Sequence, residues 1–428
     1  MIGNAGLLLG GKALNAVFNL GVLALTARTL GVESFGVLVL IHAYTQTVGE
    51  LLRFQSWQVL LSYGTGSFIE KRFGDFHRML RFSLWLDLAS GVAGVVGAIA
   101  GVWLIGTALG WQAEHQWAVT LYSLSIFFMV NGTPTGVLRL VDRFDLFALQ
   151  SPVESWVKLL CVLWAWWVGA GLEVFLAIWF FAKFASFVYV YAAAIWALKR
   201  QGVLKRFRAS ANQPLVADLP GIWGFVWSTN FNSALNLAFT QVGTLFVGAL
   251  LGASEAGLYR IAKQLADATA KPAKLIGPAL YPELARLAHG NERAALKQLI
   301  FQLAIGGGAI ATALLLLASV IGGEALGLLI GPEYVAAQTV MLWLLAAGVI
   351  GIWAVPLEPL LLSTGSATTA LKAKLAVVLP YLPLLYWATE QHGLVGAGMA
   401  AVVGALLLFF IQLWLVLRWF ARSKALAA

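Results

Sequence analysis

Long apolar runs separated by short polar joints occupy most of the chain. Runs of about 20 apolar residues are typical of helices that cross a membrane. No basic residue precedes the first run and no small-x-small cleavage motif follows it, so we expect a membrane span there rather than a signal peptide. The pattern predicts twelve helices, near residues 6–28, 35–61, 82–107, 117–138, 146–168, 174–198, 221–251, 256–281, 298–320, 336–362, 371–388 and 394–417.

The composition agrees with an integral membrane protein. The chain has 428 residues, of which 60% are hydrophobic and 11% are charged, whereas about 25% of a soluble globular chain is charged. These values exclude a disordered chain, a small secreted scaffold and a soluble enzyme. The single cysteine, Cys161, excludes an intrachain disulfide and argues against a cysteine-based metal site. No cofactor is expected.

Basic residues alternate along the chain from one joint to the next. Every second joint and the C-terminal tail hold most of the 28 Lys and Arg residues: Lys71, Arg72, Arg78, Arg81, Arg139, Arg143, Lys199, Arg200, Lys205, Arg206, Arg208, Arg286, Arg293, Lys297, Lys372, Lys374, Arg418, Arg422 and Lys424. The other joints hold no Lys or Arg and carry Glu33, Glu114, Glu173, Glu255, Glu324, Glu333 and Glu390. Because cytoplasmic loops of membrane proteins collect cations, both termini are predicted to be cytoplasmic. The net charge of +9 is then mainly a topology signal, and no nucleic-acid partner is expected.

Two short segments recur half a chain apart. Residues 30–36 (LGVESFG) and 251–257 (LGASEAG) join corresponding helices at an offset of 221, and Pro134 and Pro356 differ by 222. Six helices per half would insert both halves the same way up, which gives parallel repeats about an axis along the membrane normal. We predict an all-α integral membrane protein of 12 transmembrane helices in two six-helix lobes. The lobes would cover residues 1–198 and 221–428, joined by a basic cytoplasmic linker at residues 199–220.

Nine basic residues fall inside the predicted helices. They are Lys12, Arg28, Arg53, Lys158, Lys183, Arg260, Lys263, Lys271 and Lys274. A cation at a helix centre costs about 2.5–3.5 kcal/mol on insertion scales, so these side chains should face protein or water. At 100° per residue, polar residues share one face on each of the first, second, seventh and eighth predicted helices. We expect these faces to form a hydrated seam between the lobes.

The predicted seam carries an excess of positive charge. Asp267 is one turn from both Lys263 and Lys271 and can neutralise one of them, and Glu154 and Lys158 are expected to cancel each other. Arg28 and Arg260 lie near helix ends, where they can reach the membrane surface. The remaining surplus suits a substrate that carries phosphate groups. The candidate binding cations are Lys12, Arg53, Lys263, Lys271 and Lys274, and the candidate polar lining is Asn15, Asn19, His42, Gln46, Asn236, Gln264 and Asp267.

Isolated acids inside the helices are candidates for coupling transport to an ion. They are Glu50, Asp87 and Glu358. Glu358 lies between Pro356 and Pro359, which free backbone carbonyls and should distort the helix. Pairing of such a carboxylate with a cavity cation is the alternative interpretation, and the sequence leaves both open.

No enzyme motif is present. The five histidines are dispersed, and the chain has no phosphate-binding loop, zinc spacing or nucleophile elbow. We therefore predict no catalytic residues and a protein that is not an enzyme.

The chain resembles the bacterial polysaccharide-biosynthesis flippases, which share a superfamily with the multidrug and toxin extruders. The resemblance lies in Gly11-Lys12 with Asn15 and Phe18, in residues 27–31 (ARTLG) running into Phe35-Gly36, and in residues 136–139 (GVLR) followed by Arg143-Phe144. It implies two helical lobes and alternating access. It also implies movement of an undecaprenyl-diphosphate-linked oligosaccharide across the bacterial cytoplasmic membrane for O-antigen, capsule or exopolysaccharide synthesis.

The resemblance implies partners as well: the lipid-linked oligosaccharide, the bilayer and, as candidates, other polysaccharide-assembly proteins. The family's cationic cavity would here fall on Lys12, Arg53, Lys271 and Lys274. Two other functions are weighed against the flippase. A multidrug or organic-cation antiporter of the same superfamily would require acidic residues in its cavity, whereas the excess here is basic. A membrane polysaccharide polymerase or ligase would need catalytic Arg or His in its external joints, and the external joints of this chain contain no Arg or Lys.

Overall fold

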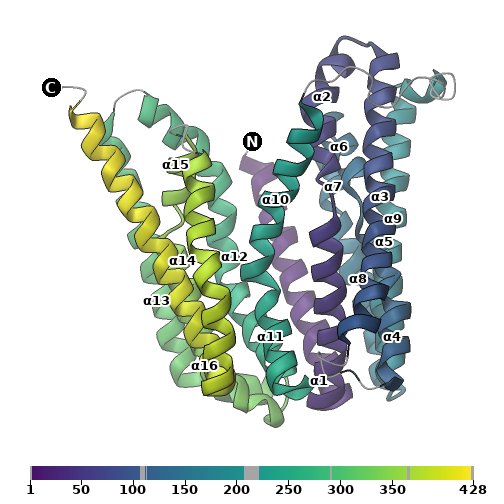
Figure 1. The fold of residues 1–428 in the computed structure, drawn as a ribbon, viewed down its shortest axis with the longest axis vertical. Coiled ribbons are helices and arrows are strands. Elements are labelled where there is room, and N and C mark those ends of the chain that lie inside the picture. The colour runs from purple at the N-terminus through teal and green to yellow at the C-terminus, as the bar shows by residue number, and fades with distance from the viewer. Residues whose placement is uncertain are drawn as a thin grey trace. The chain divides into compact units, whose positions relative to one another are not determined.

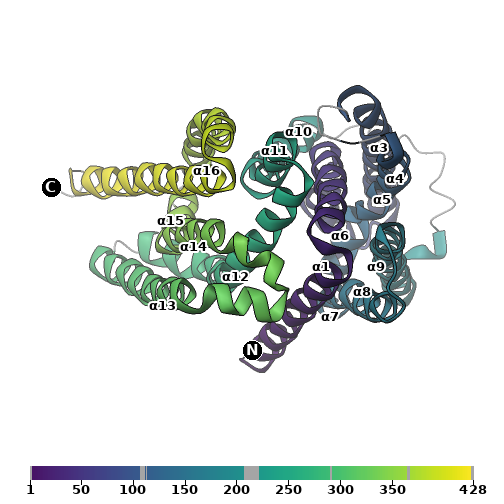
Figure 2. The same ribbon diagram turned by 90° about the horizontal axis from the view of Figure 1, so that it is seen from below.

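The computed structural model describes residues 2–106, 111, 113–206, 221–289, 292–363 and 367–425, and all regular elements in these ranges are helices (Figures 1 and 2). The first part of the chain forms α1 (Ile2–Leu52), α2 (Ser56–Ile69), α3 (Phe73–Ile105), α4 (Ala113–Ser123), α5 (Ser125–Met129), α6 (Gly132–Leu140), α7 (Phe144–Ala148), α8 (Gln150–Trp167), α9 (Leu172–Arg200) and η1 (Val203–Arg206). The rest forms α10 (Ile222–Thr240), α11 (Val242–Leu251), α12 (Ala253–His289), α13 (Arg293–Leu329), η3 (Pro332–Ala337), α14 (Gln338–Trp353), α15 (Leu357–Ser363) and α16 (Ala367–Ala425).

The prediction of an all-α membrane protein is confirmed. Eight helical stretches in the described ranges are long and apolar enough to cross a membrane. Two of them, Phe18–Ile69 and Lys372–Ala421, each cover two predicted helices. The count of twelve spans therefore stays a prediction.

Glycines mark the joints inside the two longest helices. Helix α1 departs from helical geometry at Gly31 (φ 71°, ψ 173°), and α16 does so at Gly393 (φ 58°, ψ −143°). A positive φ strains any residue with a Cβ, so glycine lets the chain turn between two apolar runs. Figure 1 shows α16 as two straight segments that meet at the bottom of the view. Gly252, which corresponds to Gly31 at the predicted repeat offset, has a similar conformation (φ 96°, ψ 178°). The repeat itself stays a prediction.

Several predicted helices are interrupted, so the continuity expected of them is wrong. The run at 221–251 is split at Gln241 into α10 and α11. The run at 35–61 breaks between Leu52 and Ser56, and the run at 117–138 breaks at Val130 and Asn131. The distortion predicted around Pro356 is confirmed, since α14 ends at Trp353 and α15 begins at Leu357.

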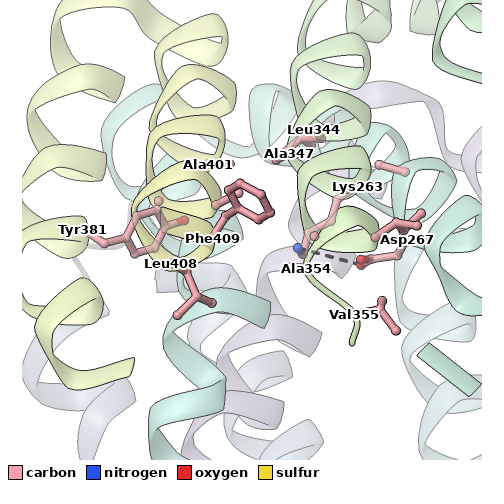
Figure 3. Close-up of a pocket in the computed structure, with 16 residues that line it drawn as sticks. Lys263, Asp267, Leu344, Ala347, Ala354, Val355, Tyr381, Ala401, Leu408 and Phe409 are labelled. Atoms are coloured by element: carbon pink, nitrogen blue, oxygen red, sulfur yellow. Dashed lines mark ion pairs between the residues drawn. The ribbon is translucent and has the colours of Figure 1, made fainter. Parts of the chain in front are cut away.

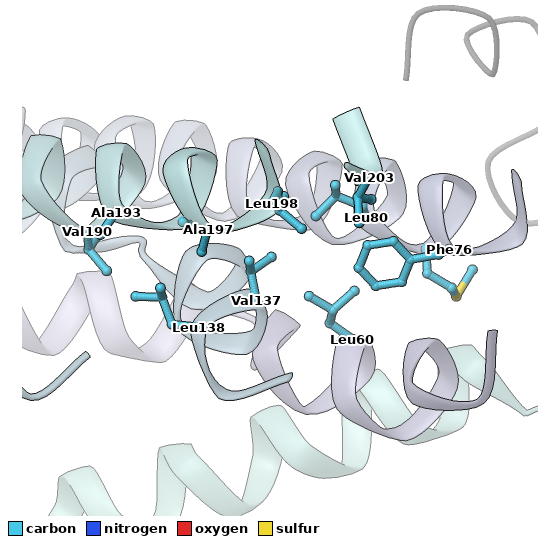
Figure 4. Packing of buried hydrophobic residues seen from close by; sticks show 12 residues of the cluster. Leu60, Phe76, Leu80, Val137, Leu138, Val190, Ala193, Ala197, Leu198 and Val203 are labelled. Atoms are coloured by element: carbon cyan, nitrogen blue, oxygen red, sulfur yellow. The ribbon is translucent and has the colours of Figure 1, made fainter. Parts of the chain in front are cut away.

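The contacts divide the chain into two compact units, Met1–Leu237 and Ala238–Ala428. In the first unit, α2 packs against α3 and α6, and α6 packs against α9. Figure 4 shows the buried core that these helices share, with Leu60, Phe76, Val137 and Val190 among its members. In the second unit, α14 packs against α12, α13 and α16.

The first unit includes most of α10. Ile222 and Val226 of α10 are buried against Val59, Phe82 and Leu86. Packing therefore groups residues 222–237 with the N-terminal helices, whereas the repeat pattern places them at the start of the second lobe. The predicted lobes at 1–198 and 221–428 describe the repeat rather than the packing, and they stay a prediction.

Candidate functional site

The polar face of α1 lies against α8 inside the first unit. Asn15 donates from Nδ2 to Ser151 Oγ at 2.8 Å, and Asn19 donates from Nδ2 to Ser155 Oγ at 3.1 Å. Ser151 and Ser155 are one turn apart, so two successive turns of each helix are joined by side-chain hydrogen bonds. These two predicted lining residues thus tie α1 to α8.

A buried carboxylate on α8 holds two ammonium groups. Glu154 Oε1 lies 2.7 Å from Lys158 Nζ and 2.9 Å from Lys183 Nζ, and the three side chains are only 12–19% exposed. The predicted Glu154–Lys158 pair is confirmed, and Lys183 of α9 joins it. Sequence spacing could not show this third member, because its helix neighbours α8 only after folding. The single negative charge of Glu154 is paired with the two positive charges of Lys158 and Lys183, so the cluster carries one net positive charge.

His42 and two aromatic residues extend this cluster. His42 Nδ1 lies 2.9 Å from the Tyr122 hydroxyl oxygen, and the ring of Trp179 meets the imidazole edge-on at a centroid distance of 4.7 Å. Lys158 Nζ lies 5.1 Å from the centroid of the same Trp179 ring, within the range of a cation–π contact. His42 is therefore a buried member of a polar cluster within the first unit, among α1, α4, α8 and α9.

Asp87 of α3 joins two of the interrupted helices. Ser56, the first residue of α2, donates from Oγ to Asp87 Oδ1, and Thr133 in the first turn of α6 donates its backbone N–H to Asp87 Oδ2 at 2.7 Å. The carboxylate is 4% exposed. A Cβ at Gly132 would overlap the Ser56 hydroxyl, so glycine at this position lets the starts of α2 and α6 approach each other. A negative charge at two helix N-termini also favours the local dipoles.

Other side chains cap the remaining backbone groups at the two breaks. Phe54 donates its N–H to Ser90 Oγ at 3.0 Å, and Ser90 lies one turn after Asp87 on α3. Asn230 of α10 donates from Nδ2 to the carbonyl of Arg53 at 3.0 Å. The Tyr191 hydroxyl donates to the carbonyl of Val130 at 3.5 Å. Broken helices at membrane depth need such partners, because no water satisfies their backbone there.

Arg53 lies in the first break. Its guanidinium donates from Nη1 to the carbonyl of Met129, the last residue of α5, at 3.3 Å. The side chain is half-buried, and this is the one hydrogen bond that its guanidinium makes to the described residues. A guanidinium has five N–H donors, so most of them stay available for a ligand. The predicted cation at position 53 thus lies in the break between α1 and α2 and makes one hydrogen bond to α5.

The second unit contains a pocket of about 310 Å³ at Lys263 and Asp267. Figure 3 shows these two residues of α12 facing side chains of α16, with Tyr381 and Phe409 on that side. Lys263 Nζ lies 3.8 Å from Asp267 Oδ2, so the predicted pairing of these residues is confirmed. Glycines and alanines of α14 and α16 leave the space, and the walls are mostly apolar.

Glu358 is held by a lysine on the next helix. Its Oε1 lies 2.7 Å from Lys374 Nζ of α16. Glu358 is thus paired, but with a lysine that the sequence pattern places in a joint and not in the cavity, so pairing with a cavity cation and a coupling role both stay predictions. Gln46, Glu50 and Gln264 are partly buried. The side chains of Lys12, Asn236, Lys271 and Lys274 lie outside the described residues. No group of three His, Cys, Asp or Glu side chains that could hold a metal ion occurs in the described part of the chain.

Sequence comparison identifies the family. The profile of the polysaccharide biosynthesis protein family matches residues 2–288. The chain is 32% identical over 320 residues to the inner membrane protein YghQ of Escherichia coli K12, which covers 74% of this chain and 89% of that protein.

Solved structures show the fold. An inward-facing multidrug resistance transporter of the MATE family and the MOP superfamily matches with a TM-score of 0.76 at 14% identity, over 96% of both chains. The lipid II flippase MurJ in an inward closed conformation matches with a TM-score of 0.69 at 11% identity, over 96% of this chain and 87% of that one. The predicted polysaccharide-biosynthesis family and the predicted transporter-like fold are thereby confirmed. The chain is a multi-pass membrane protein that belongs to the polysaccharide biosynthesis protein family and has the fold of the MOP-superfamily transporters.

Proposed function

We propose that the protein is an alternating-access flippase that moves an undecaprenyl-diphosphate-linked oligosaccharide across the bacterial cytoplasmic membrane for cell-surface polysaccharide synthesis. The family match over residues 2–288 carries this proposal. The chain shares its fold with a solved structure of a lipid II flippase, and this similarity supports the proposal because the name of that protein gives a lipid as its substrate. A relative named as an inner membrane protein supports the location. Both termini would be cytoplasmic.

The diphosphate would be bound by in-membrane cations that the sequence places on the polar faces of the first, second and eighth predicted helices. These are Lys12, Arg53, Lys263, Lys271 and Lys274. Arg53 supports the assignment best, because its guanidinium is anchored through one N–H and keeps its other donors. Phosphate oxygens accept such donors in pairs, and the bond is strengthened by the opposite charges. The glycan would occupy the hydrated seam and the prenyl chain would stay in the lipid.

Reconstitution tests the proposal directly. A lipid-linked oligosaccharide is incorporated into proteoliposomes, and the fraction in the outer leaflet is followed with an impermeant sugar-modifying reagent. We expect R53Q and K274A to slow transfer about tenfold or more, since each removes a charge-assisted contact. R200Q is the matched control, because Arg200 ends α9 and lies over the Trp196 ring at 4.2 Å. Unchanged transfer in both R53Q and K274A would remove the site assignment, and no transfer by the wild-type protein would remove the function.

An organic-cation antiporter is the second candidate. The structural match to a multidrug transporter favours it. The excess of cations among the in-membrane charges opposes it, because a cationic drug needs acidic partners. Efflux of an organic cation from cells, abolished in E154Q or D87N, would favour this function over the flippase.

A further inference from the structure

A polar pocket of about 440 Å³ lies where α2 ends and α3 begins. Ser62, Tyr63, Gly66 and Ser67 line it from one face of α2, at helical spacing. Arg72, Asp75, Arg78 and Met79 line it from the joint and the first turns of α3.

The pocket lies at the membrane boundary. The joint that forms it separates two stretches apolar enough to cross a membrane, Phe18–Ile69 and Phe73–Leu104. Ile69, the last residue of the first stretch, is 71% exposed beside it. A pocket at this level faces lipid headgroups rather than the hydrocarbon core.

The two arginines of the pocket differ in their hydrogen bonds. Arg72 makes two charged contacts, because Nε lies 2.7 Å from Glu70 Oε2 and Nη1 lies 2.6 Å from Asp75 Oδ2. Arg78 Nη1 is 3.9 Å from Asp75 Oδ1, which is beyond hydrogen-bond distance. Its Nε is buried and has no hydrogen-bond partner among the described residues. The Arg78 guanidinium therefore lies near Asp75 with 23% of its side chain exposed and with its hydrogen-bonding capacity largely unused.

The pocket is also open at its helical wall. A Cβ built on Gly66 meets no atom within 4 Å, so a ligand can approach the backbone of α2 there. Ser62 and Tyr63 lie one turn or less from Gly66 along α2 and line the same pocket. Guanidinium, hydroxyl and an exposed helix backbone together suit a phosphodiester that carries a hydroxylated headgroup.

We propose that this pocket binds the headgroup of an anionic phospholipid, such as phosphatidylglycerol, at the membrane surface. Arg78 would hold the phosphodiester, and the hydroxyls of α2 would hold the glycerol. The single negative charge of a phosphodiester fits better than a diphosphate, because Asp75 is already in the pocket and would repel a second charge. Basic pockets between transmembrane helices bind lipid headgroups by this chemistry. The inference does not depend on the transported substrate.

Lipid-dependent thermal unfolding of the full protein in neutral detergent tests the inference. Mixed micelles with increasing phosphatidylglycerol should raise the Tm of the wild-type protein, whereas phosphatidylcholine should not, because a ligand that binds the folded state stabilises it. R78Q should weaken the apparent affinity about tenfold or more, since it removes the charge-assisted hydrogen bonds. G66L should weaken it as much by filling the pocket from an open position.

Two controls match these variants. R81Q removes the same charge from the same helix but lies outside the pocket lining, and G74L adds the same side chain at another glycine whose Cβ meets nothing within 4 Å. Both should keep most of the phosphatidylglycerol response. The inference is overturned if R78Q and G66L respond like the wild type, or if phosphatidylcholine stabilises as well. It is also overturned if inorganic phosphate alone gives the same shift, or if undecaprenyl phosphate binds here more tightly than phosphatidylglycerol.

Discussion

Replacing Asp87 by alanine should destabilise the first unit more than replacing Asp75, the other acidic residue of α3, by alanine. The carboxylate is buried and accepts two hydrogen bonds, from Ser56 Oγ and from the Thr133 N–H. Both donors belong to first turns of helices that start inside the membrane region. In D87A these donors lose their acceptor where water cannot replace it.

The magnitude follows from the two donors. Ser56 is fully buried and Thr133 is 2% exposed. Leaving a buried donor without a partner costs about 1–3 kcal/mol, so the free energy of unfolding should fall by about 2–6 kcal/mol. The hydroxyl of Ser56 can rotate toward another acceptor, whereas the backbone N–H of Thr133 cannot. The loss of the N–H bond should therefore dominate.

D87N separates hydrogen bonding from charge. An asparagine at this position can accept from the Thr133 N–H through Oδ1 and donate to Ser56 Oγ through Nδ2. It also removes the cost of burying an ion. We expect its unfolding free energy to lie within about 1 kcal/mol of the wild type, since the hydrogen bonds are kept.

The assay is unfolding of purified protein in detergent, followed by near-UV circular dichroism, alongside transfer in proteoliposomes. D145A is the control, because Asp145 forms an exposed pair with Arg143 and should change stability little. The reasoning is refuted if D87A unfolds like the wild type. It is refuted equally if D87N is as unstable as D87A, because the charge rather than the hydrogen bonds would then hold the breaks. A D87N protein that is stable but does not transport would instead assign Asp87 to ion coupling.

Three further perturbations follow from individual contacts. E154Q should lower the free energy of unfolding by about 3–5 kcal/mol, because Lys158 and Lys183 would lose their shared carboxylate in a buried site. In the same denaturation assay, the double variant E154Q/K183M should regain part of this loss. G308A should lower the Tm, because the added Cβ would overlap the Trp353 ring. In G306A, in the same helix, the added Cβ meets no atom within 4 Å, so the free energy of unfolding should rise by about 0.5–1 kcal/mol; equal effects of the two variants would contradict the packing of α13 on α14. E358Q and K374M should each reduce stability or transfer, because Glu358 and Lys374 form one ion pair at 2.7 Å. The double variant should be no worse than either single variant, and additive losses would indicate separate roles for the two residues.

The positions of the helices could be predicted because one physical requirement dominates them. A span must be apolar over its whole length, so the apolar run at 174–198 marks α9 (Leu172–Arg200) to within two residues at each end. The turns at Gly31 and Gly393 could also be predicted, because a glycine between two apolar runs favours a turn. The outer ends were less predictable: α3 begins at Phe73 rather than near 82, because its polar first turns extend beyond the apolar run.

The charged sites could be predicted only where the partners lie on one helix. Spacing of four residues predicts the Glu154–Lys158 and Lys263–Asp267 pairs, and both are present. Lys183 joins Glu154 from α9, and Lys374 joins Glu358 from α16. Such partners depend on which helices pack together, and hydrophobic periodicity does not contain that information.

The two helix breaks show why the most informative part of the site was invisible in the sequence. Neither break contains proline at its centre, and residues 53–55 fall inside a single predicted helix at 35–61. What permits the break between α1 and α2 is a set of partners on other helices: Asp87 and Ser90 on α3, and Asn230 on α10. Each satisfies a backbone or side-chain group that a continuous helix would have satisfied itself. A polar residue on a mostly apolar helix is therefore better interpreted first as a possible cap for a neighbour's broken helix, and only then as a ligand. Applied to Asp87, this order of interpretation makes the carboxylate a structural acceptor first, while its coupling role stays a prediction that D87N tests. Arg53, which lies in the break, keeps donors that a substrate could use.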